Sequence, residues 1–265
     1  MPKFAANLTM LFNEVEFMDR FAAAAKAGVR AVEYLCPYTY SKELLAEALS
    51  KHGLTQVLHN VPAGNWADGE RGIACLPDRE GEFQDGIGRA IEYAKALRCD
   101  RLNCLVGITP RAVDPEKIQA TLIDNLRFAA RALDKARIKL LVEPINTYDI
   151  LGFHLCRTDQ TLQVFEAVGE RNLWLQYDIY HMQRMEGELA ATIAKHLSRI
   201  AHIQLADNPG RNEPGTGEIN YDYLFRRLDE LGYAGWVGCE YKPKTTTVDG
   251  LAWLDRAIKS GSGPI

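Results

Sequence analysis

Four short apolar runs in the second half of the chain each end abruptly in a side chain that carries oxygen. The runs are 139–143, 173–178, 200–204 and 236–240, and they end in Glu143, Asp178, Gln204 and Glu240. Continuous apolar runs of this length are typical of parallel strands that are buried on both faces. Because parallel strands point their carboxyl ends to the same side of a sheet, we expect these four side chains to converge.

The whole chain repeats a pattern of strand followed by helix. Earlier strands are predicted at 4–8, 31–35, 55–59 and 101–106, and earlier helices at 16–27, 41–51, 82–97 and 114–136. Later helices are predicted at 159–168, 187–197, 221–231 and 247–258. Eight such units without a break in composition predict an α/β fold, a single closed (β/α)₈ TIM barrel with outer helices. We expect the catalytic barrel to span residues 1–258 and residues 259–265 to form a frayed tail.

Composition excludes several classes of protein. The 265 residues are 47% hydrophobic and 25% charged, as in soluble globular proteins, and the net charge is −4. This charge argues against a nucleic-acid-binding surface, and the absence of a long uncharged apolar run argues against a signal peptide or a membrane span. The six cysteines form no CxxC pair, which favours buried thiols over disulfides or a zinc site. We therefore expect a cytoplasmic protein that binds neither nucleic acid nor membrane.

Three carboxylates in one cavity would repel one another strongly unless a cation neutralised them. Glu143, Asp178 and Glu240 would create this situation at the barrel mouth, with the amide oxygen of Gln204 beside them. Carboxylate and amide oxygens are ligands of hard divalent cations. Structural ion pairs are the alternative for the three acids, and a buried hydrogen-bonded amide is the alternative for Gln204.

Two predicted connections are too long to be simple turns. They cover residues 60–78 and 206–220, and both would lie on the catalytic face of the barrel. We expect them to form lids or substrate walls. Trp66, in the first of them, either covers a ligand or packs the loop onto the barrel.

Five segments together resemble the bacterial hydroxypyruvate isomerase family. They are HNVPAGNWADGERGIACLP at 59–77, EPIN at 143–146, YDIYHMQRMEGEL at 177–189, EPGTGEINYDYLF at 213–225 and GCEYKP at 238–243. The likeness covers nearly the whole chain. That family belongs to the xylose-isomerase-like barrels, beside the ketose 3-epimerases, and its members bind a divalent cation in the barrel mouth.

The resemblance implies roles for particular residues. The metal ligands would be Glu143, Asp178, Gln204 and Glu240, and the acid–base pair would be Glu143 and Glu240. Gln204 stands where the wider superfamily often has a metal-binding histidine, so an all-oxygen shell favours Mg²⁺ or Mn²⁺ over zinc. The same difference makes a ketose 3-epimerase a poorer match. His202, two residues earlier on its strand, is interpreted as structural.

The implied substrate is a small 2-oxo or hydroxy acid, and its carboxylate needs a cationic partner. Arg211, Arg71, Lys242 and His181 are the candidates, and arginine suits bidentate recognition of a carboxylate. His181 matches a superfamily histidine that contacts substrate, and His59 is the next candidate for this role. Relatives are often oligomers, so we expect a homo-oligomer.

Four alternatives to hydroxypyruvate isomerase activity remain open. The nearest is a 2-oxo-tetronate isomerase, which performs the same chemistry on a substrate with one more carbon, and a ketose 3-epimerase follows. An apurinic-site endonuclease shares the barrel, but it should show several histidine ligands and a basic groove. A non-catalytic sugar-binding barrel would leave the pair of glutamates unexplained.

Overall fold

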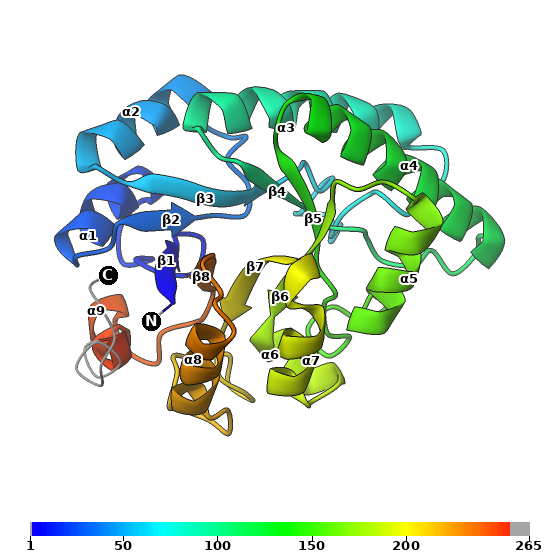
Figure 1. Ribbon diagram of the computed structural model, residues 1–265. Helices are drawn as coiled ribbons and strands as arrows, with labels where there is room; N and C mark the ends of the chain where they lie inside the picture. The colour runs from blue at the N-terminus through cyan, green and yellow to red at the C-terminus, as the bar shows by residue number, and fades with distance from the viewer. Residues whose placement is uncertain (1, 255–265) are drawn as a thin grey trace.

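The computed structural model describes residues 2–254, which form a closed barrel of parallel strands with helices around the outside (Figure 1). The strands are β1 (Lys3–Asn7), β2 (Ala31–Glu33), β3 (Thr55–Asn60), β4 (Arg101–Cys104), β5 (Lys139–Val142), β6 (Leu173–Asp178), β7 (Ile200–Leu205) and β8 (Trp236–Cys239). Each strand pairs with its neighbour in chain order, and β8 closes the barrel on β1, with Gly238 opposite Ala5. The predicted TIM barrel is therefore confirmed.

Helices cover the outer face of the barrel, and α2 to α5 form a continuous arc along one side of it (Figure 1). The helices are η1 (Phe17–Asp19), α1 (Arg20–Lys26), α2 (Lys42–His52), α3 (Glu80–Leu97), α4 (Pro115–Lys135), α5 (Thr158–Val168), α6 (Ile179–Met185), α7 (Leu189–His196), η2 (Leu197–Arg199), α8 (Tyr221–Glu230) and α9 (Thr247–Gly250). Ser41 caps α2 by accepting a hydrogen bond from the Leu44 N–H, as its position in the sequence predicts.

The segment after β6 differs from the prediction. The sequence predicts one helix at 187–197, whereas the structure has α6 directly after Asp178 and then α7. Asp178 both ends the strand and caps α6, and Gly187 and Glu188 turn the chain with positive φ angles of 70° and 48°. Near the end of the described residues, α9 spans Thr247–Gly250, Leu251 forms a turn and residues 252–254 are helical again, so the described part of the predicted helix at 247–258 is helical apart from this turn. Residues 255–258 and the predicted tail at 259–265 lie outside the described part of the chain.

Apolar and polar side chains divide the barrel interior between them. A small cluster of buried residues includes Ala5, Ala31, Val57 and Leu141, and the partly buried rings of Trp174 and Trp236 pack against it. The polar side chains follow two residues later on several of the same strands. This alternation by two is the strand period, which stacks inward-facing residues in layers. The polar layer therefore lies at the carboxyl end of the strands, and the small apolar cluster lies below it in the barrel.

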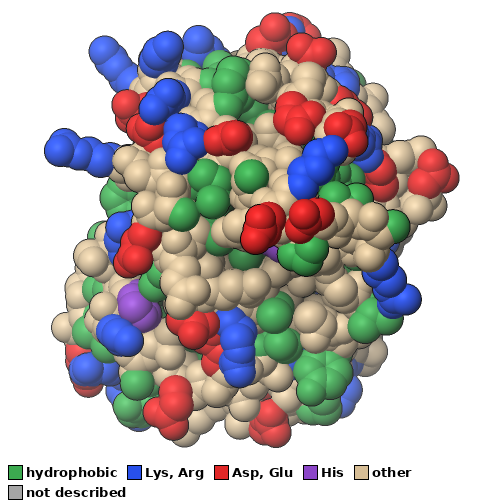
Figure 2. Space-filling model, turned by 90° about the vertical axis from the view of Figure 1, so that its right-hand side faces the viewer, with side chains coloured by type: hydrophobic (Ala, Val, Ile, Leu, Met, Phe, Trp, Pro, Cys, Tyr) green, Lys and Arg blue, Asp and Glu red, His purple; other side chains and the backbone are tan. Residues whose placement is uncertain are grey.

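The outer surface carries charges of both signs. On the face drawn in Figure 2, lysine and arginine side chains are interspersed with aspartate and glutamate side chains. Within residues 2–254, no helix is both long enough and apolar enough to cross a membrane.

Candidate active site at the barrel mouth

Polar side chains from all eight strands or their ends meet at the mouth of the barrel. They are Asn7, Glu33, His59, Asn60, Asn103, Glu143, Gln176, Asp178, His202, Gln204 and Glu240. Each is at most 6% exposed. Buried polar groups need hydrogen-bond partners, and most of these side chains find them in one another. The four side chains that end the apolar runs in the sequence all belong to this layer.

The two carboxylate oxygens of Asp178 have different surroundings. Its Oδ1 accepts hydrogen bonds from the backbone N–H groups of Tyr180, at 2.7 Å, and His181, at 3.2 Å. Its Oδ2 is buried and has no hydrogen-bond partner among the described residues. Burial raises the pKa of the carboxyl group to about 6, although the Arg211 guanidinium acts in the opposite direction. An unpartnered buried carboxylate oxygen of this kind fits a cation-binding role.

Glu143 lies beside Asp178 and His181. Its Oε2 accepts hydrogen bonds from Asn103, at 3.1 Å, and Gln176, at 2.9 Å. The Nε2 atom of His181 is 3.8 Å from Oε1 of Glu143 and 3.7 Å from Oδ2 of Asp178. One potential ligand atom from each of these three residues lies within 4.8 Å of the other two, close enough to share a metal ion. Burial, together with the charges of Glu240 and Asp178, raises the pKa of Glu143 well above its usual range.

Gln204 and Glu240 contact each other in the same layer. Nε2 of Gln204 donates to Oε2 of Glu240 at 2.5 Å, and Oε1 of Gln204 accepts from Gln176 at 2.6 Å. Arg211 donates to Oε1 of Glu240 at 2.6 Å. Burial raises the pKa of Glu240 to about 8 against the opposing effect of Arg211. Gln176 therefore links three of the four predicted ligands, Glu143, Gln204 and Glu240, in one hydrogen-bond network, whereas the side chain of Asp178 makes no hydrogen bond to them. The joint role of the four residues in binding a cation stays a prediction.

The orientation of His181 follows from its neighbour Asn146. Oδ1 of Asn146 accepts from the backbone N–H groups of Tyr148, at 3.0 Å, and Asp149, at 2.8 Å, which fixes the side-chain amide. Nδ2 of Asn146 must then donate to Nδ1 of His181, 2.6 Å away. Burial and nearby arginines lower the pKa of His181 well below its usual value, so the ring is neutral and its hydrogen is on Nε2. The Nε2–H group of His181 therefore lies on the side of Glu143 and Asp178, at 3.8 and 3.7 Å, beyond hydrogen-bond distance.

A cavity of about 590 Å³ opens above this layer. Its lining includes the predicted site residues Trp66, Arg71, Glu143, His181, Arg211, Glu240 and Lys242. Asp178, Gln204 and His59 are not part of the lining. Burial lowers the pKa of His59 to about 4, so its ring is neutral, and its Nδ1 lies 3.1 Å from the Asn60 carbonyl oxygen.

The two long loops both contribute to the cavity wall. In the first, the Arg71 guanidinium stacks on the Trp66 ring, 3.9 Å from its centroid. Gly72 holds this loop against the barrel: its φ is 109°, and an added Cβ would lie 2.0 Å from the Leu105 carbonyl oxygen. Val106, predicted as strand, instead forms an isolated antiparallel bridge with Gly72 beyond the end of β4.

In the second loop, Asp207 organises the backbone around Arg211. Its two oxygens accept from the backbone N–H groups of Asn208, Gly215, Thr216, Gly217 and Ile219. The loop places Arg211 between Glu240 and Asp149, whose Oδ2 is 3.4 Å from Nη1 of Arg211. Nε of Arg211 is buried and has no hydrogen-bond partner among residues 2–254.

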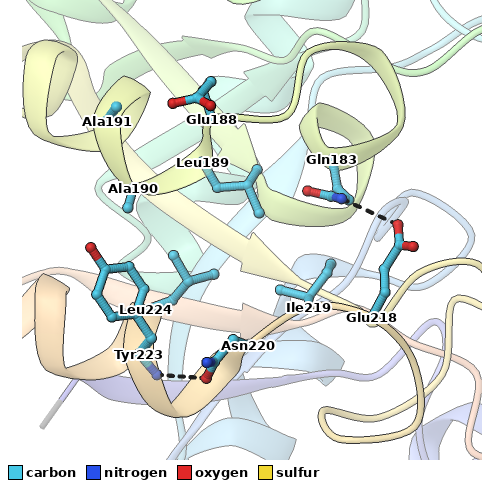
Figure 3. Close-up of a pocket in the computed structure, with 10 residues that line it drawn as sticks. All are labelled: Gln183, Glu188, Leu189, Ala190, Ala191, Glu218, Ile219, Asn220, Tyr223 and Leu224. Carbon is cyan, nitrogen blue, oxygen red and sulfur yellow. Dashed lines mark hydrogen bonds between the residues drawn. The ribbon is translucent and has the colours of Figure 1, made fainter.

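A second cavity, of about 400 Å³, lies between α7 and the start of α8. Leu189, Ile219 and Leu224 supply apolar walls, and a hydrogen bond from Gln183 to Glu218 spans one side (Figure 3). None of the predicted site residues lines it. The barrel mouth, which brings together the buried acids and the neutral histidine, is therefore the candidate active site.

Sequence reasoning missed several members of the polar layer. Glu33, Asn7, Asn103 and Gln176 all hydrogen-bond to predicted site residues or to one another, yet none was singled out. Each is a polar residue within or at the end of an otherwise apolar run. Extending the strand-end argument to amides and to the first four strands would have found them.

A closed parallel barrel with several buried acids at the carboxyl end of its strands belongs to the class of TIM-barrel enzymes. The family model described as "Xylose isomerase-like TIM barrel" matches residues 21–257. This chain belongs to that family, within the group of hydroxypyruvate isomerases, and is an isomerase.

Two relatives and one solved structure show how close the likeness is. Hydroxypyruvate isomerase of Escherichia coli is 57% identical, over 96% of this chain and 99% of the relative. 2-Oxo-tetronate isomerase of Cupriavidus necator is 48% identical, over 96% and 98%. A crystal structure from Brucella melitensis, described as a family 2 AP endonuclease, is 44% identical with a TM-score of 0.94, over 97% and 99%.

Proposed function

We propose that this isomerase interconverts hydroxypyruvate and 2-hydroxy-3-oxopropanoate (tartronate semialdehyde) through an enediolate. The observation that carries the proposal is the pair of buried glutamates at the cavity, Glu143 after β5 and Glu240 after β8. Moving a carbonyl to the neighbouring carbon requires one group to take a proton and a group to return it. Support for the substrate comes from the name and the 57% identity of the relative from Escherichia coli.

The two glutamates differ in how free they are to move a proton. Glu143 lines the cavity. Its Oε2 accepts hydrogen bonds from Asn103 and Gln176, whereas its Oε1 lies 3.8 Å from Nε2 of His181 and accepts no such hydrogen bond from the described residues. Glu240 has both oxygens in hydrogen bonds, one of them with Arg211. We therefore assign the first proton abstraction to Oε1 of Glu143 and the return of the proton to Glu240. Burial, which raises both pKa values, makes the carboxylates stronger bases.

We infer that Mg²⁺ or Mn²⁺ is the cofactor, held by Glu143, Asp178, Gln204 and Glu240. The donor set supports this inference, because it consists of oxygens and because Oδ2 of Asp178 is buried without a partner among the described residues. When bound, such a cation acts as a Lewis acid that stabilises developing negative charge. The cation would also relieve the repulsion that raises the pKa of Glu143.

We assign recognition of the substrate carboxylate to Arg211. Its side chain is 18% exposed, its Nε has no partner among the described residues, and it lines the cavity. The Nε2–H of His181 is placed to donate to a substrate oxygen. Arg71, Lys242 and Trp66 complete the wall, and His59 lies outside its lining residues, so we give His59 no direct contact with substrate.

Two substitutions test the acid–base assignment. Glu143→Gln and Glu240→Gln each keep the side-chain shape but remove the proton-transfer group, and each should lower kcat by about 10²- to 10⁴-fold. Circular dichroism should show that both variants remain folded. Glu166→Gln, an exposed position on α5, is the matched control and should keep full activity. Near-normal kcat in either active-site variant would remove its residue from the proposed role.

Substrate profiling tests the choice of substrate. We expect the highest kcat/KM with hydroxypyruvate, a lower value with four-carbon 2-oxo-tetronates and the lowest with ketoses. A preference for 2-oxo-tetronates would instead support the activity named for the relative from Cupriavidus necator. The cytoplasmic location, the lack of nucleic-acid binding and the homo-oligomer stay predictions, and light scattering after size-exclusion chromatography measures the last.

A further inference from the structure

Glu33, at the end of β2, is a buried carboxylate for which neither the sequence nor the proposed reaction gives a role. Its residue exposure is 0%, and it does not line the cavity. Oε1 accepts hydrogen bonds from Asn7, at 3.0 Å, and Gln204, at 2.8 Å. Oε2 lies 2.7 Å from Nε2 of His202. Burying a carboxylate carries a large free-energy cost unless hydrogen bonds or an ion pair compensate for it, and Glu33 has three such partners.

Glu33 and Glu240 share the same two amide donors. Nε2 of Gln204 donates to both carboxylates, at 2.8 Å and 2.5 Å, and Nδ2 of Asn7 also donates to both, at 3.0 Å and 3.1 Å. Both N–H hydrogens of the Gln204 amide are therefore engaged in hydrogen bonds to carboxylates. Turning the amide over would place its oxygen against two carboxylates, so Glu33 fixes the orientation of Gln204. Oε1 of Gln204 consequently faces the side of Gln176, which also donates to Glu143.

Strand β8, which is separated from β2 by β1, leaves space for Glu33 at one position. A Cβ added to Gly238 would lie 2.3 to 2.5 Å from the three carboxyl atoms of Glu33. Gly238 pairs with Gln204 in the register of β7 and β8, two residues before Glu240. A glycine at this place thus allows the carboxylate to reach both amides. It also offers a way to displace Glu33 without changing its chemistry.

We propose that Glu33 is a positioning residue for the reaction. It holds the amide of Gln204 and the carboxylate of Glu240 in the orientation that cation binding and proton transfer need, and it does so without contacting substrate. This inference rests on the proposed function, because it takes Gln204 and Glu240 as part of the working site. The competing explanation is a buried pair of Glu33 and His202 that serves stability alone.

Binding of Mn²⁺ to the metal-free protein separates these explanations. Glu33→Gln places an amide N–H₂ among donors, so at least one hydrogen bond is lost, and Gly238→Ala pushes the carboxylate out of place. Loss of a group that orients metal ligands typically costs about 10- to 100-fold in metal affinity or activity. We expect both variants to lose Mn²⁺ affinity by that factor in calorimetric titration. We also expect kcat to fall about as much, with KM within about threefold of wild type.

The control and the conservative variant complete the design. Gln56→Leu removes a buried amide that donates to the Leu58 carbonyl oxygen, away from the mouth, and should change thermal stability but neither Mn²⁺ affinity nor kcat. Glu33→Asp keeps the charge and should retain more Mn²⁺ affinity than Glu33→Gln. If Glu33→Gln and Gly238→Ala both fold and keep the Mn²⁺ affinity and kcat of the wild type, the positioning role of Glu33 is overturned, but the proposed function is not. Absence of Mn²⁺ binding by the wild-type protein would overturn the proposed cation site together with the positioning role.

Discussion

Replacing Asp178 by asparagine should affect folding and cation binding in opposite directions. The amide side chain would keep an oxygen to accept the N–H groups of Tyr180 and His181, so the cap of α6 survives. The substitution removes the charge on the unpartnered oxygen, which we assign to the cation. We therefore expect Asp178→Asn to stabilise the metal-free protein and to abolish stabilisation by Mn²⁺.

The magnitude follows from the pKa of Asp178, which burial raises to about 6 from an ordinary value of 3.8. At about 1.4 kcal/mol for each pH unit between these values, ionising the buried group costs about 3 kcal/mol at pH 8. The folded metal-free protein binds more protons than the unfolded chain between about pH 4 and pH 6, so its stability falls as the pH rises through that range. The gain in the free energy of unfolding of metal-free Asp178→Asn over the wild type should therefore be complete above pH 6 and vanish near pH 4.

Thermal unfolding followed by circular dichroism measures this effect in EDTA and in Mn²⁺ at several pH values. For a chain of this size, 3 kcal/mol sets an upper limit of roughly 10 °C on the increase in Tm. Asp207→Asn is the matched control: Asp207 is equally buried, but its oxygens accept from five backbone N–H groups, so an amide there should lower Tm. A lower Tm for Asp178→Asn in EDTA at pH 8, or a wild-type response to Mn²⁺, would refute the reasoning.

Three further predictions concern the cation, the first loop and the histidine. EDTA should abolish turnover, and Mg²⁺ or Mn²⁺ should restore it; activity that survives exhaustive chelation would contradict the proposed cofactor. Gly72→Ala should cost about 1–3 kcal/mol in urea unfolding because its Cβ would meet the Leu105 carbonyl oxygen, and a loss no larger than that of Gly69→Ala, which has positive φ but open space, would remove the clash as the cause. Asn146→Leu should lower kcat about tenfold because Nδ1 of His181 loses the donor that orients the ring, and steady-state kinetics showing an unchanged kcat would argue against that orientation.

The barrel could be predicted because its strand ends are marked by abrupt changes from apolar to polar residues. Asp178 and Gln204 stand out for this reason, and the parallel geometry brings them into one layer. Glu33 was missed because β2 is only three residues long and two apolar residues follow it, which made the carboxylate look internal to a longer strand. The α6 helix was missed because seven residues are too few to show a helical period.

The pairing of side chains within the mouth could not be predicted. Arg211 was one of several cationic candidates, and only the three-dimensional path of its loop places it between Glu240 and Asp149. That path depends on hydrogen bonds from backbone groups to Asp207, which leave no pattern in the sequence. Likewise, the tautomer of His181 depends on the position of Asn146, which is 35 residues away in the chain.

The hydrogen bond from Asn7 to Glu240 joins residues that are 233 positions apart. The first and last strands must therefore dock before this polar layer is complete, and contacts of such long range form late because they require the largest loop closure. We therefore expect the polar layer to be completed late in folding, and a chain interrupted before β8 would lack Glu240 and with it the complete layer.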